Sequence, residues 1–147
     1  MKTTSIGVIG CGYWGPNLLR NFAENEAAQL RWVCDVDEVR MASMSRRYPF
    51  AQTASDYRKL LDDPELDAVA VVTPVATHYQ IAKEFLRAGK HVLLEKPLTA
   101  TIAEAEELIS QFKNGDTSPG QETQPPEPIT SALPYVRNSA FLVPPEL

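Results

Sequence analysis

The sequence predicts an α/β fold: a doubly wound parallel sheet with helices on both faces, followed by an irregular proline-rich tail. Three observations lead to this prediction. Short β-branched runs alternate with segments of helical apolar spacing through residues 1–113. A G-x-G-x-x-G sequence joins the first strand to the first helix. After residue 113 this alternation stops, and most of the chain's 12 prolines lie beyond that point.

The first two strand and helix pairs follow from apolar spacing. Residues 5–10 are β-branched and end in glycine, which predicts a buried strand. Residues 13–25 carry apolar side chains at helical spacing, and Pro16 falls in the first turn, where a missing N–H costs little. The apolar run 29–37 predicts a second strand, and 37–48 predicts a second helix.

The middle of the chain predicts shorter elements. Residues 51–55 predict a short third strand, and Ser55 is a suitable N-cap for a short helix over 56–62. Residues 67–74 are continuously apolar, which is typical of a strand that is covered on both faces.

The last strand lies between two helices. A helix is expected over 77–89, with Gly89 as the residue just past its end, then a strand over 90–97 and a helix over 101–115. Because strands and helices alternate, the strands are expected to run parallel. The tail, 114–147, shows no sustained period, and its first half is polar, which predicts a disordered or extended segment.

Composition excludes several classes of protein. A length of 147 residues suits one domain, and a net charge of −5 without a Lys/Arg cluster argues against a nucleic-acid partner. The two cysteines, Cys11 and Cys34, form no C-x-x-C pair, so neither a zinc site nor a disulfide framework is expected. No apolar run is long enough for a signal peptide or a membrane helix. We therefore expect a cytoplasmic protein without a metal site or a membrane partner.

The glycine-rich loop predicts a dinucleotide-binding site. Gly10 permits a tight turn out of the strand, Gly12 lets a pyrophosphate approach the backbone, and Gly15 lets the helix pack closely on the strand. The helix N-terminus adds free N–H groups and a partial positive charge. Tyr13 and Trp14 lie inside the loop and are counted among the cofactor-binding residues.

An acidic residue at the end of the second expected strand completes this Rossmann-like pattern. Asp35 lies 20 residues after Gly15, where its carboxylate can accept hydrogen bonds from the adenosine ribose. It would repel a 2′-phosphate, and Val36, the next residue, is not a cation, so NAD is favoured over NADP. The alternatives are a structural turn with a surface aspartate, and a Rossmann-type methyltransferase, whose loop usually reads G-x-G-x-G.

Two further segments follow strands and are expected at the same edge of the sheet. Thr73 and Pro74 would line the cofactor crevice, and His78 would begin the next helix, either contacting a ligand or serving in capping and packing.

Glu95, Lys96 and Pro97 end the last strand of the alternating pattern and are expected among the cofactor-binding residues. A lysine at this position is costly unless it is paired or functional, and its ammonium would point toward the nicotinamide end of the crevice.

The segment AGKHVLLEKPL at 88–98 resembles the signature of the glucose-fructose oxidoreductase/inositol dehydrogenase (Gfo/Idh/MocA) family. GVIGCGYWGPNLLRNF, VCDVD and VVTPVATHY resemble the nucleotide-binding domain of that family, in the same order. The resemblance covers about residues 4–113. It implies hydride transfer between NAD(P) and a carbinol carbon of a sugar, cyclitol or nucleotide sugar. It also implies that Lys96 is the catalytic-site lysine and that the Lys96–Pro97 peptide is cis.

The sequence departs from that family after residue 113. Family members are much longer, and their second domain supplies the substrate pocket, the remaining catalytic groups and the surface for homo-oligomers. Where the family has a further apolar strand, this chain has GDTSPGQETQPPEPI. We therefore expect a C-terminally truncated domain over 1–113 with an open sheet edge, a foreign tail over 114–147, and no turnover by the chain alone.

Two functions remain as alternatives to an oxidoreductase. The chain could be a non-enzymatic or degenerate dinucleotide-binding module. It could also be a small interaction protein whose TQPPEPI segment adopts polyproline II, although basic residues do not flank that segment.

Overall fold

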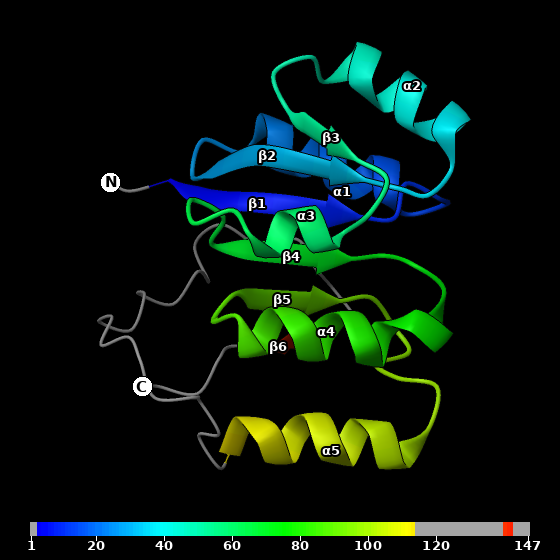
Figure 1. Cartoon of the computed structure of the whole chain (residues 1–147). Helices are drawn as coiled ribbons and strands as arrows, with labels where there is room; N and C mark the ends of the chain where they lie inside the picture. Colours follow the sequence, from blue (N-terminus) through cyan, green and yellow to red (C-terminus); the bar gives the residue numbers. More distant parts are fainter. Residues whose placement is uncertain (1–2, 114–139, 143–147) are drawn as a thin grey trace.

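A computed structural model describes residues 3–113 and 140–142 of the chain (Figure 1). Its strands form a single sheet in the order β3-β2-β1-β4-β5-β6. The first five strands pair in parallel, and the register of β1 with β2 shifts between Ile6 and Gly7. Those five strands are β1 (Thr4–Ile9), β2 (Ala28–Cys34), β3 (Gln52–Ala54), β4 (Ala68–Val71) and β5 (His91–Leu94).

Helices cover both faces of the sheet, as expected for a doubly wound fold. In Figure 1, α1 lies behind the sheet, and α3 and α4 lie in front of it. The other two helices cover one face each. Met44 of α2 packs into the core on the α1 face, and Leu108 of α5 packs into the core on the α4 face. The helices are α1 (Gly15–Glu24), α2 (Glu38–Arg47), α3 (Arg58–Leu61), α4 (His78–Arg87) and α5 (Ile102–Lys113), and a short 3₁₀ turn, η1 (Val75–Thr77), precedes α4.

Strand β4 shows why the central strands are continuously apolar. Ala68 and Ala70 pack into the core on the α1 face, whereas Val69 and Val71 pack into the core on the α4 face. All four residues are buried, because side chains alternate between two covered faces. The doubly wound parallel sheet predicted from the sequence is therefore confirmed.

The helix termini follow the sequence signals at one site and depart from them at another. Gly89 has φ +75°, and its N–H donates to the Leu86 carbonyl at 2.9 Å, so the predicted end of α4 is confirmed. The prediction of Ser55 as N-cap is wrong, because α3 begins only at Arg58. The N-cap position is Tyr57, which makes no side-chain capping hydrogen bond, and Asp56 Oδ1 accepts one from the Arg58 N–H at 2.9 Å.

The far edge of the sheet differs from the expectation. Strand β6 (Ala140–Leu142) pairs antiparallel with β5, with Phe141 opposite Leu93. The edge that the sequence analysis left open is thus paired, and the short apolar run 140–142 satisfies backbone groups of β5. The rest of the predicted tail, 114–139 and 143–147, lies outside the described residues, and the domain division at residue 113 stays a prediction.

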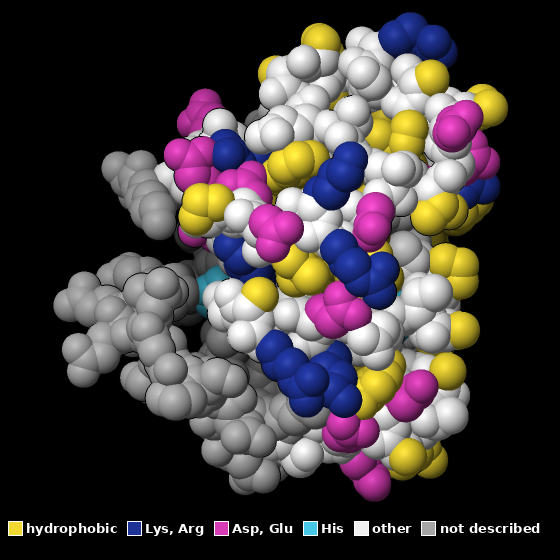
Figure 2. Space-filling view, viewed as in Figure 1, with side chains coloured by type: hydrophobic (Ala, Val, Ile, Leu, Met, Phe, Trp, Pro, Cys, Tyr) yellow, Lys and Arg dark blue, Asp and Glu magenta, His cyan; other side chains and the backbone are white. Residues whose placement is uncertain are grey.

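The surface carries both signs of charge. Figure 2 shows Lys and Arg side chains interspersed with Asp and Glu over the face that includes α4 and α5. Such mixing is typical of a solvated face rather than of a nucleic-acid-binding one. Within the described ranges, no helix combines the length and the apolar character needed to cross a membrane.

Candidate dinucleotide-binding site

The glycine loop lies between β1 and α1, at the carboxyl edge of the sheet. Gly10 has φ +101°, and a Cβ there would lie 2.7 Å from both the carbonyl carbon and the oxygen of Val72. A Cβ on Gly15 would overlap the Gly10 carbonyl oxygen. Both positions therefore exclude any side chain, which agrees with the tight turn and the close strand–helix packing predicted for them.

Gly12 differs from the two other loop glycines because open space lies beside it. Of the described atoms, a Cβ on Gly12 would approach only Arg40 Nη1, at 3.8 Å. Among the described residues, no side-chain hydrogen bond caps α1 at Trp14, and the N-terminus of that helix carries a partial positive charge beside the loop. The backbone at Gly12 is thus accessible to an anionic group, and the loop fits the pyrophosphate of a dinucleotide.

Asp35, directly after β2, is buried against this loop. Its Oδ2 accepts a hydrogen bond from the Cys11 N–H at 2.6 Å, and its Oδ1 accepts one from the Asp37 N–H at 2.8 Å. A carboxylate has about four acceptor positions, so two remain for the hydroxyls of a ribose. Asp35 therefore also holds the glycine loop against the end of β2, a role that the sequence analysis missed.

Both cysteines lie beside this carboxylate. Burial, together with the negative charge of Asp35, raises the pKa of the Cys11 thiol to about 12. The same two causes raise the pKa of Cys34 to about 12. Since the thiolate is the reactive form, these raised pKa values lower the reactivity of both thiols near neutral pH.

The loop after β4 lies beside the glycine loop, because β4 pairs with β1. Thr73 is half-buried, its Oγ1 lies 2.6 Å from Thr77 Oγ1, and Pro74 is exposed. His78 is almost fully buried, with Nε2 2.8 Å from the Thr73 carbonyl and Nδ1 3.0 Å from the Pro97 carbonyl. Its ring connects the loops that follow β4 and β5, which favours the packing interpretation. Direct contact of these three residues with a cofactor stays a prediction.

The loop after β5 carries the lysine. The Glu95 N–H donates to the Val71 carbonyl at 3.1 Å, which continues the pairing with β4. The Lys96–Pro97 peptide is cis, as the family resemblance implied. Lys96 and Pro97 are both exposed, so the argument that lysine is costly at this position does not apply. The sheet order places Lys96 two strands away from the glycine loop, at the same edge.

Two exposed aromatic residues and one cation complete the rim. Tyr13 and Trp14 pack edge to face with a ring-centroid distance of 5.2 Å, and 87% of Tyr13 is exposed. Arg40, on the first turn of α2, was missed by the sequence analysis, which examined only the residue after Asp35. Its guanidinium lies 3.8 Å from Asp35 Oδ2. The sequence signal that could have identified it is Asp37, the N-cap of α2, which places Arg40 in the first turn of that helix, close after Asp35.

Comparison with known proteins agrees with this geometry. The sequence profile of the Gfo/Idh/MocA oxidoreductases, a family with an NAD-binding Rossmann fold, matches residues 4–117. Inositol 2-dehydrogenase 2 of Saccharopolyspora erythraea is 43% identical over 104 residues, which cover 70% of this chain and 30% of that protein.

Two crystal structures resemble the chain in fold and in sequence. GenD2 from gentamicin A biosynthesis, in complex with NAD, is 31% identical with a TM-score of 0.71. The match covers 75% of this chain and 31% of the GenD2 chain. KijD10 is a 3-ketoreductase from Actinomadura kijaniata in complex with NADP and TDP-benzene. It is 30% identical with a TM-score of 0.68, and the match covers 74% of this chain and 34% of the KijD10 chain.

The chain spans between about a quarter and a third of the length of the curated relatives that it matches. The matched part holds the glycine loop, Asp35 and Lys96 together. The chain belongs to the Gfo/Idh/MocA oxidoreductase family and carries its N-terminal NAD-binding Rossmann domain.

Proposed function

We propose that this chain binds NAD in preference to NADP, as the nucleotide-binding part of an oxidoreductase for sugars, cyclitols or nucleotide sugars. The observation that carries the proposal is the open backbone at Gly12, next to a buried Asp35 carboxylate with acceptor capacity to spare. Backbone around Gly12 would hold the pyrophosphate, and Asp35 would accept hydrogen bonds from the adenosine ribose.

The nicotinamide half would extend along the carboxyl edge toward β4 and β5. Thr73 and Pro74 follow β4, and Glu95, Lys96 and Pro97 follow β5, so these residues would lie along its path. The bound nicotinamide supplies or accepts a hydride. Lys96 would donate a hydrogen bond to the oxygen of the reacting carbinol or carbonyl and assist proton transfer.

The substrate class rests on the relatives. An inositol dehydrogenase carries a polyol in its name, and the KijD10 structure holds a nucleotide-type ligand, TDP-benzene, beside NADP. Both are consistent with a hydroxyl or keto group on a ring as the reacting centre. We also propose, from the family alone, that the full-length protein forms homo-oligomers.

We further propose that the 147-residue chain does not turn over substrate alone. A lysine serves as a base near neutral pH only where a dry, closed site lowers its pKa. Lys96 is exposed, and the described residues do not enclose it. This exposure is also what favours the second candidate function, a non-enzymatic dinucleotide-binding module.

Calorimetric titration with NAD and NADP tests the binding. We expect NAD to bind more tightly, because Asp35 opposes a 2′-phosphate, and we expect Asp35→Ser to narrow the difference. Binding of NADP at least as tight as that of NAD by the unmodified chain would contradict the role given to Asp35. Failure of both dinucleotides to bind would remove the proposed function altogether.

A turnover assay tests the claim of inactivity. We expect no NADH production from inositol, sugars or nucleotide sugars by the purified chain. Production that Lys96→Ala abolishes would refute that claim while supporting the catalytic assignment of Lys96. A second assay uses a fusion of this chain to the C-terminal part of a relative, beyond the matched residues. If the chain and the fusion both bind NAD but neither turns over substrate, the non-enzymatic module is favoured.

A further inference from the structure

We propose that the side of β5 that faces away from β4, here called the β5 edge, is an acceptor site for an extended apolar strand. Its occupant, beyond the chain's own β6, is Ala140–Leu142 of a second copy of this chain, which binds there when two copies exchange β6. The inference goes beyond nucleotide binding and does not depend on it. Addition of an extended strand to the edge of a sheet is a general mode of peptide recognition.

The two outer strands of the parallel part of the sheet, β3 and β5, differ in how they tolerate an edge position. Strand β3 has only three residues, and Gln52 and Thr53 are exposed. Strand β5 is buried along its whole length, and Val92 and Leu94 have no exposed surface. Proteins protect open edges with short strands and with polar, charged or proline residues. Strand β3 has such protection, whereas the apolar strand β5 requires a neighbouring strand.

The backbone of β5 presents a defined set of groups to that neighbour. The N–H groups of His91 and Glu95 donate to carbonyls at the two ends of β4, at 3.0 and 3.1 Å. Because backbone groups alternate between the two sides of a strand, the N–H and C=O of Val92 and Leu94 face away from β4. A buried N–H or C=O without a partner is costly. The β5 edge therefore offers two donors and two acceptors to an incoming strand.

Strand β6 shows how these groups are matched within one chain. Leu142 lies opposite Val92 and Ala140 lies opposite Leu94, so each outward-facing residue of β5 meets one residue of β6. Both are hydrogen-bonding positions of an antiparallel ladder, and the N–H groups of Ala140 and Leu142 consequently face β5. Recognition by backbone pairing depends on an extended segment, and not on the molecule that supplies it.

The connection to β6 sets how strongly the chain's own segment competes with one from another molecule. Residues 114–139 join α5 to β6. A connection of that length holds its two ends together at an effective concentration of no more than on the order of 1 mM. A second copy offers the same three residues to the same edge. Exchange of β6 between two copies should therefore become favourable as the concentration of the chain approaches about 1 mM.

The first experiment measures the acceptor site with Leu142→Pro in the full-length chain. Proline has no N–H to donate to β5, so the chain's own segment should release the β5 edge. The probe is a fluorescent peptide with the sequence of residues 138–143, NSAFLV. We expect it to bind Leu142→Pro with a Kd on the order of 100 μM, as for a small interface. Binding to the unmodified chain and to Leu142→Val, which keeps the N–H, should be about tenfold weaker because β6 competes.

A second experiment measures the exchange itself. Light scattering should detect dimers of the unmodified chain near 1 mM, on the order of the effective concentration, and no dimers of Leu142→Pro. Amide hydrogen exchange locates the contact. The N–H groups of Val92 and Leu94 should exchange at least about tenfold faster in Leu142→Pro than in the unmodified chain, and the peptide should slow them again.

Four outcomes would overturn the proposal. The peptide fails to bind Leu142→Pro while circular dichroism shows that this variant is folded. Leu142→Pro does not fold, in which case β6 is an obligatory part of the domain and not a replaceable strand. Dimers form equally in the unmodified chain and in Leu142→Pro, which would assign them to another surface. The unmodified chain shows no dimers near 1 mM, which would exclude a second copy as the occupant.

Discussion

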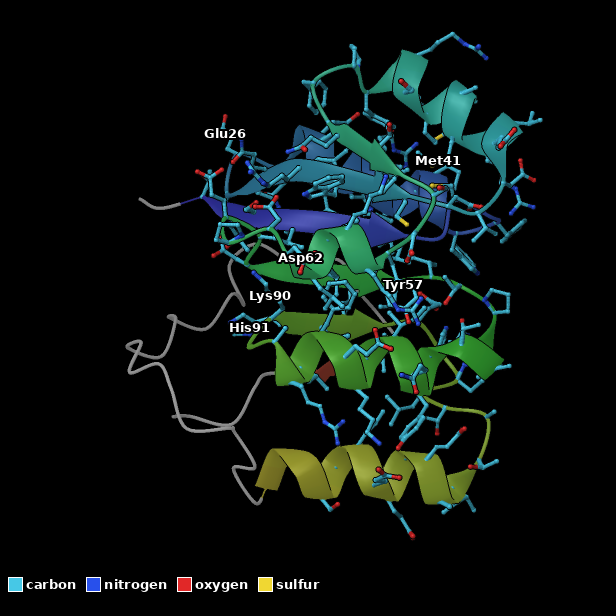
Figure 3. The ribbon with its side chains drawn as sticks, in the orientation of Figure 1. Glu26, Met41, Tyr57, Asp62, Lys90 and His91 are labelled. Atoms are coloured by element: carbon cyan, nitrogen blue, oxygen red, sulfur yellow. The ribbon has the colours of Figure 1, made fainter. Side chains whose placement is uncertain are left out.

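Each of the two edges of the sheet carries a buried aspartate, but the surroundings of the two carboxylates differ. At the amino edge, the oxygens of a buried carboxylate, Asp63, accept hydrogen bonds from two side chains and one backbone N–H of the protein. At the carboxyl edge, Asp35 has acceptor positions left over and faces the open space at Gly12. Figure 3 shows the amino edge on the left, with Glu26 beside the start of β2 and Lys90 and His91 where β5 begins.

A network of hydrogen bonds around Asp63 stabilises the amino edge. Asp63 Oδ2 accepts hydrogen bonds from Arg31 Nε and Trp32 Nε1, each at 2.6 Å, and Oδ1 accepts one from the Glu65 N–H at 2.9 Å. Lys90 Nζ donates to the Asp63 carbonyl at 2.7 Å. The hydrogen bond from Arg31 is the main reason that the pKa of Asp63 is lowered to about 2.

The comparison indicates that the amino edge stabilises the fold, whereas the carboxyl edge is suited to binding. Every contact of the Asp63 network joins residues of the protein to one another, so it stabilises the sheet and offers nothing to a ligand. The carboxyl edge instead exposes Tyr13, Trp14, Arg40 and Lys96. Exposed aromatic and charged groups beside an open backbone are suited to binding, which is the usual arrangement in open α/β sheets.

The largest effect should come from Gly10→Val, which disrupts the packing of the glycine loop at the carboxyl edge. The new side chain would require a left-handed backbone and would overlap the Val72 backbone, so we expect a loss of roughly 3–5 kcal/mol of unfolding free energy. Urea unfolding followed by circular dichroism measures this loss. Stability within about 0.5 kcal/mol of the unmodified chain would contradict the packing described for Gly10.

Gly12→Val should separate binding from folding at the same loop. Its side chain would enter open space and occupy the volume that a pyrophosphate needs, so NAD should bind at least about 100-fold more weakly. The helical signal and the urea midpoint should stay close to those of the unmodified chain. An unchanged NAD affinity, in a variant shown to be folded, would show that the loop does not hold the phosphates.

Asp63→Asn should have a smaller effect, confined to stability. Because the folded-state pKa of about 2 lies below the unfolded value of about 3.9, the ionised carboxylate contributes about 2 kcal/mol above pH 4. This contribution is lost as the pH falls from about 4 through 2. The difference between the variant and the unmodified chain should therefore shrink over that range in urea unfolding.

The neighbouring residue supplies the control for that experiment. Asp62→Asn removes a carboxylate that is exposed, so its unfolding free energy should change by less than about 0.5 kcal/mol at any of these pH values. Neither variant should alter NAD affinity. A weaker affinity in Asp63→Asn alone would mean that the two edges are coupled.

Much of the carboxyl edge could be predicted because its signals are local in the sequence. The period of apolar residues, the spacing of Gly10 and Gly15, and the 20 residues from Gly15 to Asp35 can all be read along one chain. The prediction of Ser55 as N-cap was wrong because Ser55 and Asp56 are both residue types that cap helices, whereas packing starts α3 only at Arg58, with Tyr57 at the N-cap position. The amino edge gave no such signal, because the Asp63 network joins residues about 30 positions apart.

The sequence by itself determined the order of strands and helices, the doubly wound sheet and the glycine loop, since each depends on neighbouring residues and short spacings. Only the tertiary structure decided that Asp35 anchors the loop through the Cys11 N–H, that His78 connects the loops after β4 and β5, and that β6 pairs with β5. The same is true of Arg40 beside Gly12. These contacts join residues brought together by the crossing of helices and strands, and the distance between such residues is set by packing of the whole sheet rather than by any local pattern.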